Sequence, residues 1–227
     1  MTYSICVHEA DRGEGTDVRH RFGVAVTTRY PSVGSLCPHV GESAAVATQS
    51  VTDASLGRRG VDYVADGLAV DDALEALLNA DDEAELRQVH GVDRDGDFAF
   101  TGAECPDWSG HERGTHPSRD ARYTVAGNSL TDADVLAAVV AAYEGSDWDD
   151  PLSKRLVNAL GAGAAAGGDR RTDLPVGSAA VRVTATGARS RPYDDLRVDA
   201  AESPVSDLRE TYELAKRGYD AALEKYA

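Results

Sequence analysis

Apolar and β-branched residues fill two segments near the N-terminus, residues 2–8 and 22–28, and a polar stretch with two glycines separates them. This pattern predicts two strands joined by a turn. A third strand is expected at residues 44–49, and a hairpin over residues 87–102 that turns at Asp93–Gly96. Both faces of the first runs carry apolar or small side chains, which is typical of a buried sheet.

Helical periodicity begins after these strands. Residues 60–87 are expected to form two or three short helices, with Asp72 and Glu75 as a capping box. Residues 103–121 show no period and are expected to be irregular, before an extended run begins at Arg122.

Two further helices are expected from apolar spacing and boundary residues. Thr131 and Asp134 are expected to cap the first. Pro151 is expected to open the second and Gly167–Gly168 to end it.

The C-terminal part predicts a strand at residues 177–185 and a long helix at about residues 204–226, whose apolar residues alternate three and four apart. Because the chain has no internal repeat and no linker rich in proline or serine, residues 1–227 are expected to form a single domain. The tyrosine-bearing face of the last helix is expected to pack on the body or on another subunit. A homo-oligomer, first of all a dimer, is therefore expected.

Composition limits the class of protein. Hydrophobic residues make up 42% of the 227 residues and charged residues 27%, and the mean hydropathy of −0.37 is typical of a folded, water-soluble chain. No apolar run approaches the ~18 residues of a membrane helix. The N-terminus lacks a basic region followed by an apolar core, so we expect a cytoplasmic protein without a membrane partner.

The net charge of the chain limits the classes of partner that it can bind. It has 39 Asp and Glu against 23 Lys and Arg, a formal charge of −16. Such a surface repels phosphate backbones, so no nucleic-acid partner is expected. Lysine occurs only at positions 154, 216 and 225, and Asp outnumbers Glu. We expect a halophilic surface whose carboxylates are screened only in concentrated salt, with an acidic mesophilic protein as the alternative.

The cysteines indicate a reducing compartment. Cys6, Cys37 and Cys105 are an odd number in a chain without a secretory signal, which favours free thiols. Cys6 and Cys37 lie in apolar stretches and are expected in the core.

Thr2 is the first candidate for catalysis. Initiator methionine is normally removed when the next side chain is small, and its removal would give Thr2 a free α-amino group. An amine with a pKa near ~8 can accept the hydroxyl proton at neutral pH, so one residue supplies both nucleophile and base. Many proteins begin Met-Thr without using this chemistry, and a purely structural Thr2 is the alternative.

The strand headed by Thr2, the turn and the segment Phe22–Arg29 resemble the N-terminal hairpin of the N-terminal nucleophile (Ntn) hydrolases, the superfamily of proteasome β-subunits and penicillin acylases. Further segments, in the same order along the chain, are similar to the family catalogued as domain of unknown function 1028 (DUF1028). They are Thr2–Ile5, Gly23–Arg29, Ala45–Gln49, Cys105 with Trp108, Gly110 and His111, Ala126–Asn128 and Ala166–Arg171. The resemblance covers residues 2 to about 200.

This resemblance implies an α+β fold, a four-layer αββα sandwich of two packed, mainly antiparallel sheets flanked by helices. It implies that Thr2 lies at a strand end facing a pocket, and it implies no known substrate. After Asp169-Arg170-Arg171 the resemblance implies a Gln-Ser-Ala-Ala pattern, whereas this chain has Val176-Gly177-Ser178-Ala179-Ala180 after a short insertion, which leaves the glutamine contact open. No lysine lies near position 34 to tune the nucleophile as in the proteasome, and Arg29 is the candidate to help keep the amine unprotonated.

The roles of further site residues are inferred from the resemblance together with the chemistry of their side chains. Asn128, with Thr48 and Gln49, is expected to donate hydrogen bonds to the oxyanion of a tetrahedral intermediate. Asp169 is expected to orient Thr2 or to hold a substrate ammonium group. An ordinary turn residue at Asn128, and a loop residue among surface ion pairs at Asp169, are the alternatives.

Arg29 and Arg170 are expected to bind a substrate carboxylate, and His111 to form a pocket wall or carry protons. His111 and His116, with Cys105, also permit a metal site, but the spacing C-x5-H-x4-H matches no standard zinc module. No metal and no cofactor are therefore expected.

The function expected first is an Ntn amidohydrolase that cleaves a small amide-like metabolite with Thr2. Two alternatives stay open. One is an oligomeric binding or scaffold protein on the same fold, and the other is a metal-assisted hydrolase that uses His111 and His116.

Overall fold

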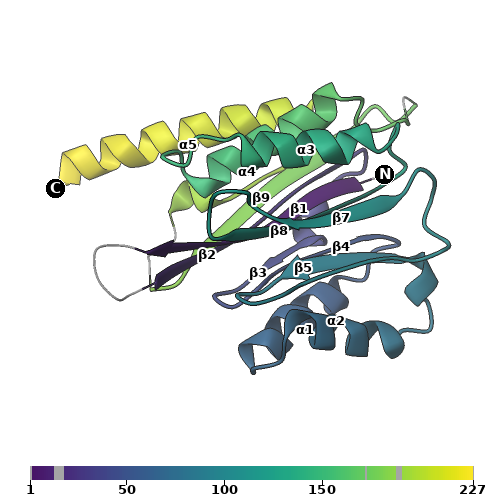
Figure 1. Cartoon of the computed structure of the whole chain (residues 1–227). Helices are drawn as coiled ribbons and strands as arrows, with labels where there is room; N and C mark the ends of the chain where they lie inside the picture. The colour runs from purple at the N-terminus through teal and green to yellow at the C-terminus, as the bar shows by residue number, and fades with distance from the viewer. Residues whose placement is uncertain (1, 13–17, 172, 188–190, 227) are drawn as a thin grey trace.

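The computed structural model describes residues 2–12, 18–171, 173–187 and 191–226. Two antiparallel sheets lie face to face, and helices cover the outer face of each sheet (Figure 1). The expected four-layer αββα sandwich is confirmed.

The larger sheet has the strand order β10-β9-β2-β1-β8-β7, and every neighbouring pair in it is antiparallel. It contains β1 (Thr2–Arg12), β2 (Val18–Thr28), β7 (Gly110–Thr115), β8 (Ala121–Asn128), β9 (Gly177–Ala185) and β10 (Asp195–Ala201). The N-terminal strand β1 is therefore central, between β2 and β8.

The smaller sheet has the order β3-β4-β5-β6 and is also antiparallel. It contains β3 (Pro38–Val40), β4 (Ala45–Ser50), β5 (Arg87–Val92) and β6 (Asp97–Thr101). The hairpin expected over residues 87–102 is confirmed as β5 and β6.

Within the residues that the structure describes, five helices form the outer layers. The smaller sheet is covered by α1 (Ala54–Ala65) and α2 (Val70–Asn79), and the larger sheet by α3 (Asp134–Glu144), α4 (Leu152–Ala165) and α5 (Pro204–Tyr226). The described ranges also contain short 3-10 helices, η1 (Val33–Ser35), η2 (Ala84–Leu86) and η3 (Pro192–Asp194).

Side chains of β1 alternate between two cores. Tyr3, Ile5 and Val7 pack under α3 and α4, whereas Cys6 packs between the sheets with Phe22 and its neighbours. A third core fills the space between the smaller sheet and its helices. Both faces of the central strands are therefore buried, which explains their apolar or small residues on both faces. All three thiols are free and buried, which confirms the core positions of Cys6 and Cys37.

In the described part of the chain, no helix is both long enough and apolar enough to span a membrane.

Three edge strands, β3, β7 and β10, are not predicted from the sequence. β7 lies in the stretch expected to be irregular, and no strand is expected at β3 or β10. No residue of β7 or β10 is buried. β7 has no apolar alternation, whereas in β10 Leu196 and Val198 alternate with charged residues and pack partly buried against the core under the helices. Polar side chains on an edge strand also discourage pairing with other chains.

The helix starts on the smaller sheet differ from expectation. The first helix begins at Ala54 instead of near residue 60, and its N-cap is Asp53, whose carboxylate accepts from Ser55 N at 2.8 Å. The capping box at Asp72 is wrong because α2 already begins at Val70. Asp72 lies instead in the first turn, where a carboxylate is favoured by the helix dipole.

On the larger sheet, the cap expected at Thr131 is wrong, since α3 begins at Asp134 and Asp132 Oδ1 accepts from Asp134 N at 2.9 Å. The limits of α4 are confirmed. Pro151 precedes it, and Gly167 and Gly168 follow it with φ of 122° and 54°, which glycine adopts more readily than other residues.

Candidate active site at the head of β1

Thr2 lies where the three central strands of the larger sheet meet the end of the sandwich. Its register partners are Thr28, the last residue of β2, and Asn128, the last residue of β8. The Thr2 hydroxyl donates to Thr28 Oγ1 at 3.2 Å, and Thr2 is 9% exposed. The turn role considered for Asn128 is wrong: the positive φ that marks the turn belongs to Ser129.

Ser4 follows Thr2 on the face of β1 that looks toward the smaller sheet. Its hydroxyl donates to Gln49 Oε1 at 2.8 Å, and its Oγ lies 2.7 Å from His90 Nε2. Because the single hydroxyl proton goes to Gln49, His90 Nε2 carries the proton in its own bond to Ser4. His90 Nδ1 then accepts from Thr124 Oγ1 at 2.8 Å.

This arrangement keeps His90 uncharged. Burial, together with a smaller contribution from the nearby His111, lowers its pKa to about 3. The pKa of His111 is itself lowered by partial burial and by Arg113. The network between the sheets is therefore neutral at physiological pH.

Gln88, on β5, joins the two sheets below Thr2. Its Oε1 accepts from Asn128 Nδ2 at 3.1 Å and from Gln49 Nε2 at 2.7 Å. Its Nε2 lies 2.9 Å from Gly127 O on β8, 3.0 Å from Gly110 O on β7 and 2.9 Å from Thr101 Oγ1 on β6. Gln88 is fully buried, so it fixes the spacing of the sheets at this end.

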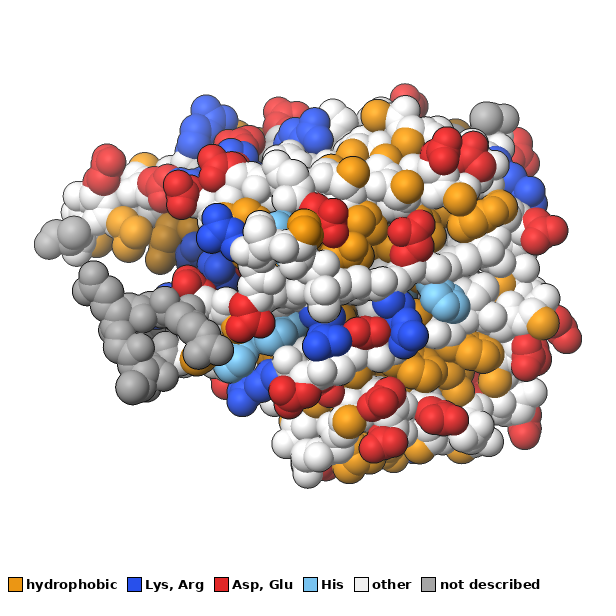
Figure 2. Space-filling view, in the orientation of Figure 1, with side chains coloured by type: hydrophobic (Ala, Val, Ile, Leu, Met, Phe, Trp, Pro, Cys, Tyr) orange, Lys and Arg blue, Asp and Glu red, His pale blue; other side chains and the backbone are white. Residues whose placement is uncertain are grey.

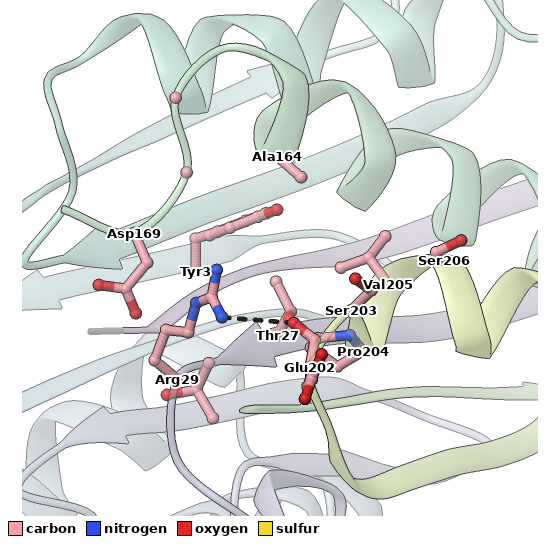
Figure 3. A pocket seen from close by; sticks show the side chains of 13 residues that line it. Tyr3, Thr27, Arg29, Ala164, Asp169, Glu202, Ser203, Pro204, Val205 and Ser206 are labelled. Atoms are coloured by element: carbon pink, nitrogen blue, oxygen red, sulfur yellow. Dashed lines mark hydrogen bonds between the residues drawn. The ribbon is translucent and has the colours of Figure 1, made fainter. Parts of the chain in front are cut away.

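A cleft of about 280 Å³ opens beside the head of β1. Tyr3, Thr28 and Arg29 line it from the larger sheet, Asp169 from the loop after α4, and Val205 from the first turn of α5. Figure 3 shows Tyr3, Arg29, Asp169 and Val205 gathered from separate elements around one hollow.

The charges of the cleft have different partners. Arg29 Nη1 donates to the backbone carbonyl of Glu202 at 3.3 Å (Figure 3). Asp169 is paired with Arg171, whose backbone N and Nη2 lie 2.8 and 3.2 Å from its two carboxylate oxygens. Burial raises the pKa of the Tyr3 phenol, and the Asp169 carboxylate raises it further. The Asp169 carboxylate therefore acts electrostatically on Tyr3, which lines the cleft.

The structure brings several expected site residues together. Asn128 and Gln49 share Gln88 as acceptor, and His111 joins the same network through Thr101, since His111 Nδ1 lies 2.9 Å from Thr101 Oγ1. His111 is exposed on its outer side, so it lies at the rim of the network.

Thr48 and Arg170 are not joined to this network. Thr48 lies on the opposite face of β4 from Gln49 and donates to Asp53 O at 3.3 Å. Arg170 is exposed and is not among the residues that line the cleft, while its backbone N donates to Ser129 O at 3.3 Å.

The residues considered for a metal site lie apart. His116 Nε2 donates to Glu144 O at 2.9 Å and its ring packs edge-on against Trp148. Cys105 Sγ donates to Arg87 O at 3.3 Å. Among residues 2–12, 18–171, 173–187 and 191–226, no group of three or more His, Cys, Asp or Glu side chains is placed to hold a metal ion.

Gly177 lies where β9 approaches the end of β2. A Cβ atom at this position would collide with the Thr28 carbonyl oxygen and press on Pro204. The close approach of β9 to the end of β2 therefore leaves no room for a side chain there.

Ser4, Gln88 and His90 are site residues that no motif in the sequence indicates. Gln88 and His90 alternate with the apolar Val89 in β5, a pattern that usually marks a strand with one solvated face. All six residues of β5 are buried. Polar residues on a strand buried on both faces are the signal that would have indicated an internal network.

Fold and site together define an αββα sandwich protein with a neutral polar network and a charged cleft at the head of its N-terminal strand. The model of the DUF1028 family, a family of unknown function, matches residues 2–208. The chain belongs to the DUF1028 family. It is similar to the crystal structure of the DUF1028 protein SPO2555 from Silicibacter pomeroyi, with a TM-score of 0.74 and 25% identity over 94% of this chain and 85% of that chain. No curated protein matches the chain.

Proposed function

We propose that this protein is an N-terminal nucleophile hydrolase that cleaves an amide bond in a small metabolite with Thr2 after removal of Met1. The observation that carries the proposal is the position of Thr2. It heads the central strand, and its hydroxyl is oriented by Thr28. Thr2 is not itself among the residues that line the cleft, but its sequence neighbour Tyr3 and its register partner Thr28 are.

The reaction needs no group beyond the chain and water. Thr2 Oγ1 attacks the amide carbonyl carbon while its proton passes to the free α-amine. The amine then protonates the leaving nitrogen as the C–N bond breaks, which leaves an ester on Thr2. The amine next takes a proton from water, the hydroxide formed attacks the ester, and the acid is released with the threonine hydroxyl restored.

Asn128 is the donor that we assign to the oxyanion. Its side-chain amide has two N–H groups, and one of them donates to Gln88. Gln49 is assigned to hold Gln88 in place, because it donates to the same oxygen. A preorganised donor aimed at an oxyanion contributes about 10²–10³ to the rate in other acyl-transfer enzymes.

Arg29 is assigned to a carboxylate of the substrate. It lies at the end of the cleft nearest Thr28, and a guanidinium can bind a carboxylate with two parallel hydrogen bonds. Its positive charge would also help to keep the Thr2 amine unprotonated. Asp169 is assigned to bind the amine of the substrate or of Thr2. Its negative charge already raises the pKa of Tyr3, which lines the same cleft.

The test is the intact mass of protein purified in concentrated salt, before and after reaction with a β-lactone. We expect loss of Met1 and a single adduct that maps to Thr2. The variant Thr2→Ala should form no adduct. The matched control Thr28→Ala removes the neighbouring hydroxyl but keeps the nucleophile, and it should still react.

Full retention of Met1 together with no adduct would contradict the proposal. That result would favour the second candidate, a binding or scaffold protein without turnover. An adduct retained in Thr2→Ala would assign the reactivity to another side chain.

A further inference from the structure

Helix α5 consists of an anchored half and an unanchored half. With 23 residues it is about 35 Å long. Its buried residues are Pro204, Leu208 and Tyr212, and Tyr212 is held by an edge-on contact with the Tyr193 ring. None of residues 213–226 is buried. Figure 1 shows this second half running outward to the free C-terminal end of the helix.

The apolar face of the helix continues into the unanchored half. Tyr219 still touches the body through the Tyr193 ring at 5.7 Å, and Ala222, Leu223 and Tyr226 follow at helical spacing. Leu223 is 52% exposed and Tyr226 80% exposed. Figure 2 shows hydrophobic side chains along the underside of the outer part of this helix. We name Tyr219, Ala222, Leu223 and Tyr226 the tail face.

Local interactions hold this half of the helix only weakly. Lys216 Nζ lies 2.6 Å from Asp220 Oδ2, and such a solvent-exposed pair four residues apart contributes little to helix stability. A helix of this length without a packed face is marginal in water. Burial of the tail face would supply the missing stabilisation.

The charge pattern indicates what covers the tail face. Residues 209–227 contain four acidic and four basic residues, so residues 1–208 carry the whole formal charge of −16. Two of the three lysines of the chain, Lys216 and Lys225, lie in the unanchored half. This segment is therefore the part of the chain at which a second copy can approach with the least repulsion.

We infer that residues 213–226 bind the same segment of a second copy of this chain, with the two helices antiparallel and the tail faces together. An antiparallel pair places the two acidic bodies at opposite ends of the contact, whereas a parallel pair would place them side by side. The acidic and basic residues within the segment also allow pairing between copies. This inference is independent of the proposed hydrolase function.

The contact between two such segments is smaller than the ~1,200 Å² of a standard interface, so the dimer should dissociate on dilution. Repulsion between the bodies weakens it at low ionic strength. We therefore expect the dimer to tighten as salt is raised, because the Debye length falls to about 3 Å at 1 M.

The experiment is sedimentation equilibrium of the full chain over a concentration series in molar salt, with helicity followed by circular dichroism. Wild type should show a monomer–dimer equilibrium. The double variant Leu223→Glu/Tyr226→Glu should raise the dissociation constant by at least about tenfold. Leu214→Glu is the matched control, because Leu214 is 53% exposed on another side of the same helix and should leave the equilibrium unchanged.

Cysteine cross-linking tests the orientation, since the native thiols are buried. Single cysteines are placed at 215, 219, 222 and 226. In an antiparallel pair, one position faces the same position of the other copy, so the variant with its cysteine there should cross-link most, and the yield should fall at the positions on either side. A mixture of two variants whose cysteines lie on opposite sides of that position should form mixed cross-linked dimers.

Three outcomes would overturn the inference. They are a monomer at every concentration, a dimer that persists unchanged in the double variant, or equal self-cross-linking at all four cysteines.

Discussion

Strand β1 carries a neutral polar cluster on one face and a charged cluster on the other. Toward the smaller sheet, Ser4 lies among hydroxyls, amides and the uncharged His90. Toward the helices, Glu9 is fully buried and accepts from Arg155 Nη2 at 2.7 Å and from Tyr143 OH at 3.0 Å. The alternation of side chains along one strand separates the two clusters.

Buried polar groups have different roles in the two clusters. The Glu9–Arg155 pair must stay complete, because a single charge in a medium of low dielectric constant is very unfavourable. It ties α4 to β1 and has no opening to solvent. The neutral network contains no charged group, so no ionic charge within it acts electrostatically on Thr2. The basicity of a free Thr2 amine is then set by the charges of the cleft.

The largest expected effect is at the charged cluster. Arg155→Met removes the buried cation of Glu9, which then keeps only the partly exposed Arg21, whose Nε lies 3.3 Å from Glu9 Oε2. It also removes the guanidinium that lies 4.4 Å from the centre of the Trp148 ring. We expect a loss of about 3–5 kcal/mol in the free energy of unfolding, measured with denaturant in molar salt.

The matched control for this prediction is the double variant Glu9→Gln/Arg155→Met, which removes both charges. It should be more stable than Arg155→Met alone. If the second substitution lowers stability further, Glu9 and Arg155 are not coupled as described.

The next effect is a pH dependence carried by His90. The unfolded chain binds a proton on this residue near pH 6.5, whereas folded His90 binds it only near pH 3. The unfolded state therefore holds more protons between these values, and stability falls as pH is lowered through that window. Above about pH 6.5 His90 contributes no pH dependence.

The measurement is the free energy of unfolding against pH in fixed salt. His90→Asn should have a shallower slope than wild type between about pH 6.5 and 3, by up to one proton. Identical slopes would contradict an uncharged, buried His90.

A smaller effect is expected at Gln88. Gln88→Leu keeps the side chain buried but leaves Asn128, Gln49 and the Gly127 carbonyl without their partner. We expect a loss of about 1–3 kcal/mol, the cost of unsatisfied buried polar groups. The rate of β-lactone addition at Thr2 should also fall, because Asn128 is no longer oriented.

Thr101→Val is the control for Gln88, since it removes one partner of Gln88 and leaves its bonds to Asn128 and Gln49. It should retain most of the reaction rate. A Gln88→Leu protein that reacts as fast as wild type would show that the network does not position the site.

The smallest effect distinguishes the two faces of β4. Thr48→Val removes one hydrogen bond of 3.3 Å on the helix side, and we expect less than about 1 kcal/mol and no change in Thr2 reactivity. Gln49→Leu, one residue along, should lower both stability and reactivity. Both variants are measured by denaturant unfolding and by adduct formation, and equal behaviour would contradict the assignment of faces.

Several parts of this fold could be predicted from the sequence. The apolar faces of β1, β2 and β9 and the capping residues around α4 are local signals, and each was recognised. The edge strand β7 lacks such a signal, because its exposed polar residues carry no period. In the edge strand β10 the signal is short, with Leu196 and Val198 alternating with charged residues. Their pairing is decided by the neighbouring strand and not by their own composition.

The site was predicted in part for a similar reason. Thr2 and Asn128 can be identified from their places in motifs, and the register of β1 with β8 brings them together. The choice between Thr48 and Gln49 depends on which face of β4 meets the other sheet, and adjacent residues in a sequence do not indicate that. Gln88 and Arg155 lie inside buried elements, where a polar residue is recognised only when its distant partners are known.

The central claim is that Thr2 reacts as a nucleophile with its own amine as the base. The most direct measurement is the rate of β-lactone addition against pH for processed protein and for protein that carries a residue before Thr2. The account predicts a rate that rises with deprotonation of an amine near or below pH ~8, and no addition to the extended protein. Equal rates for the two proteins would contradict it.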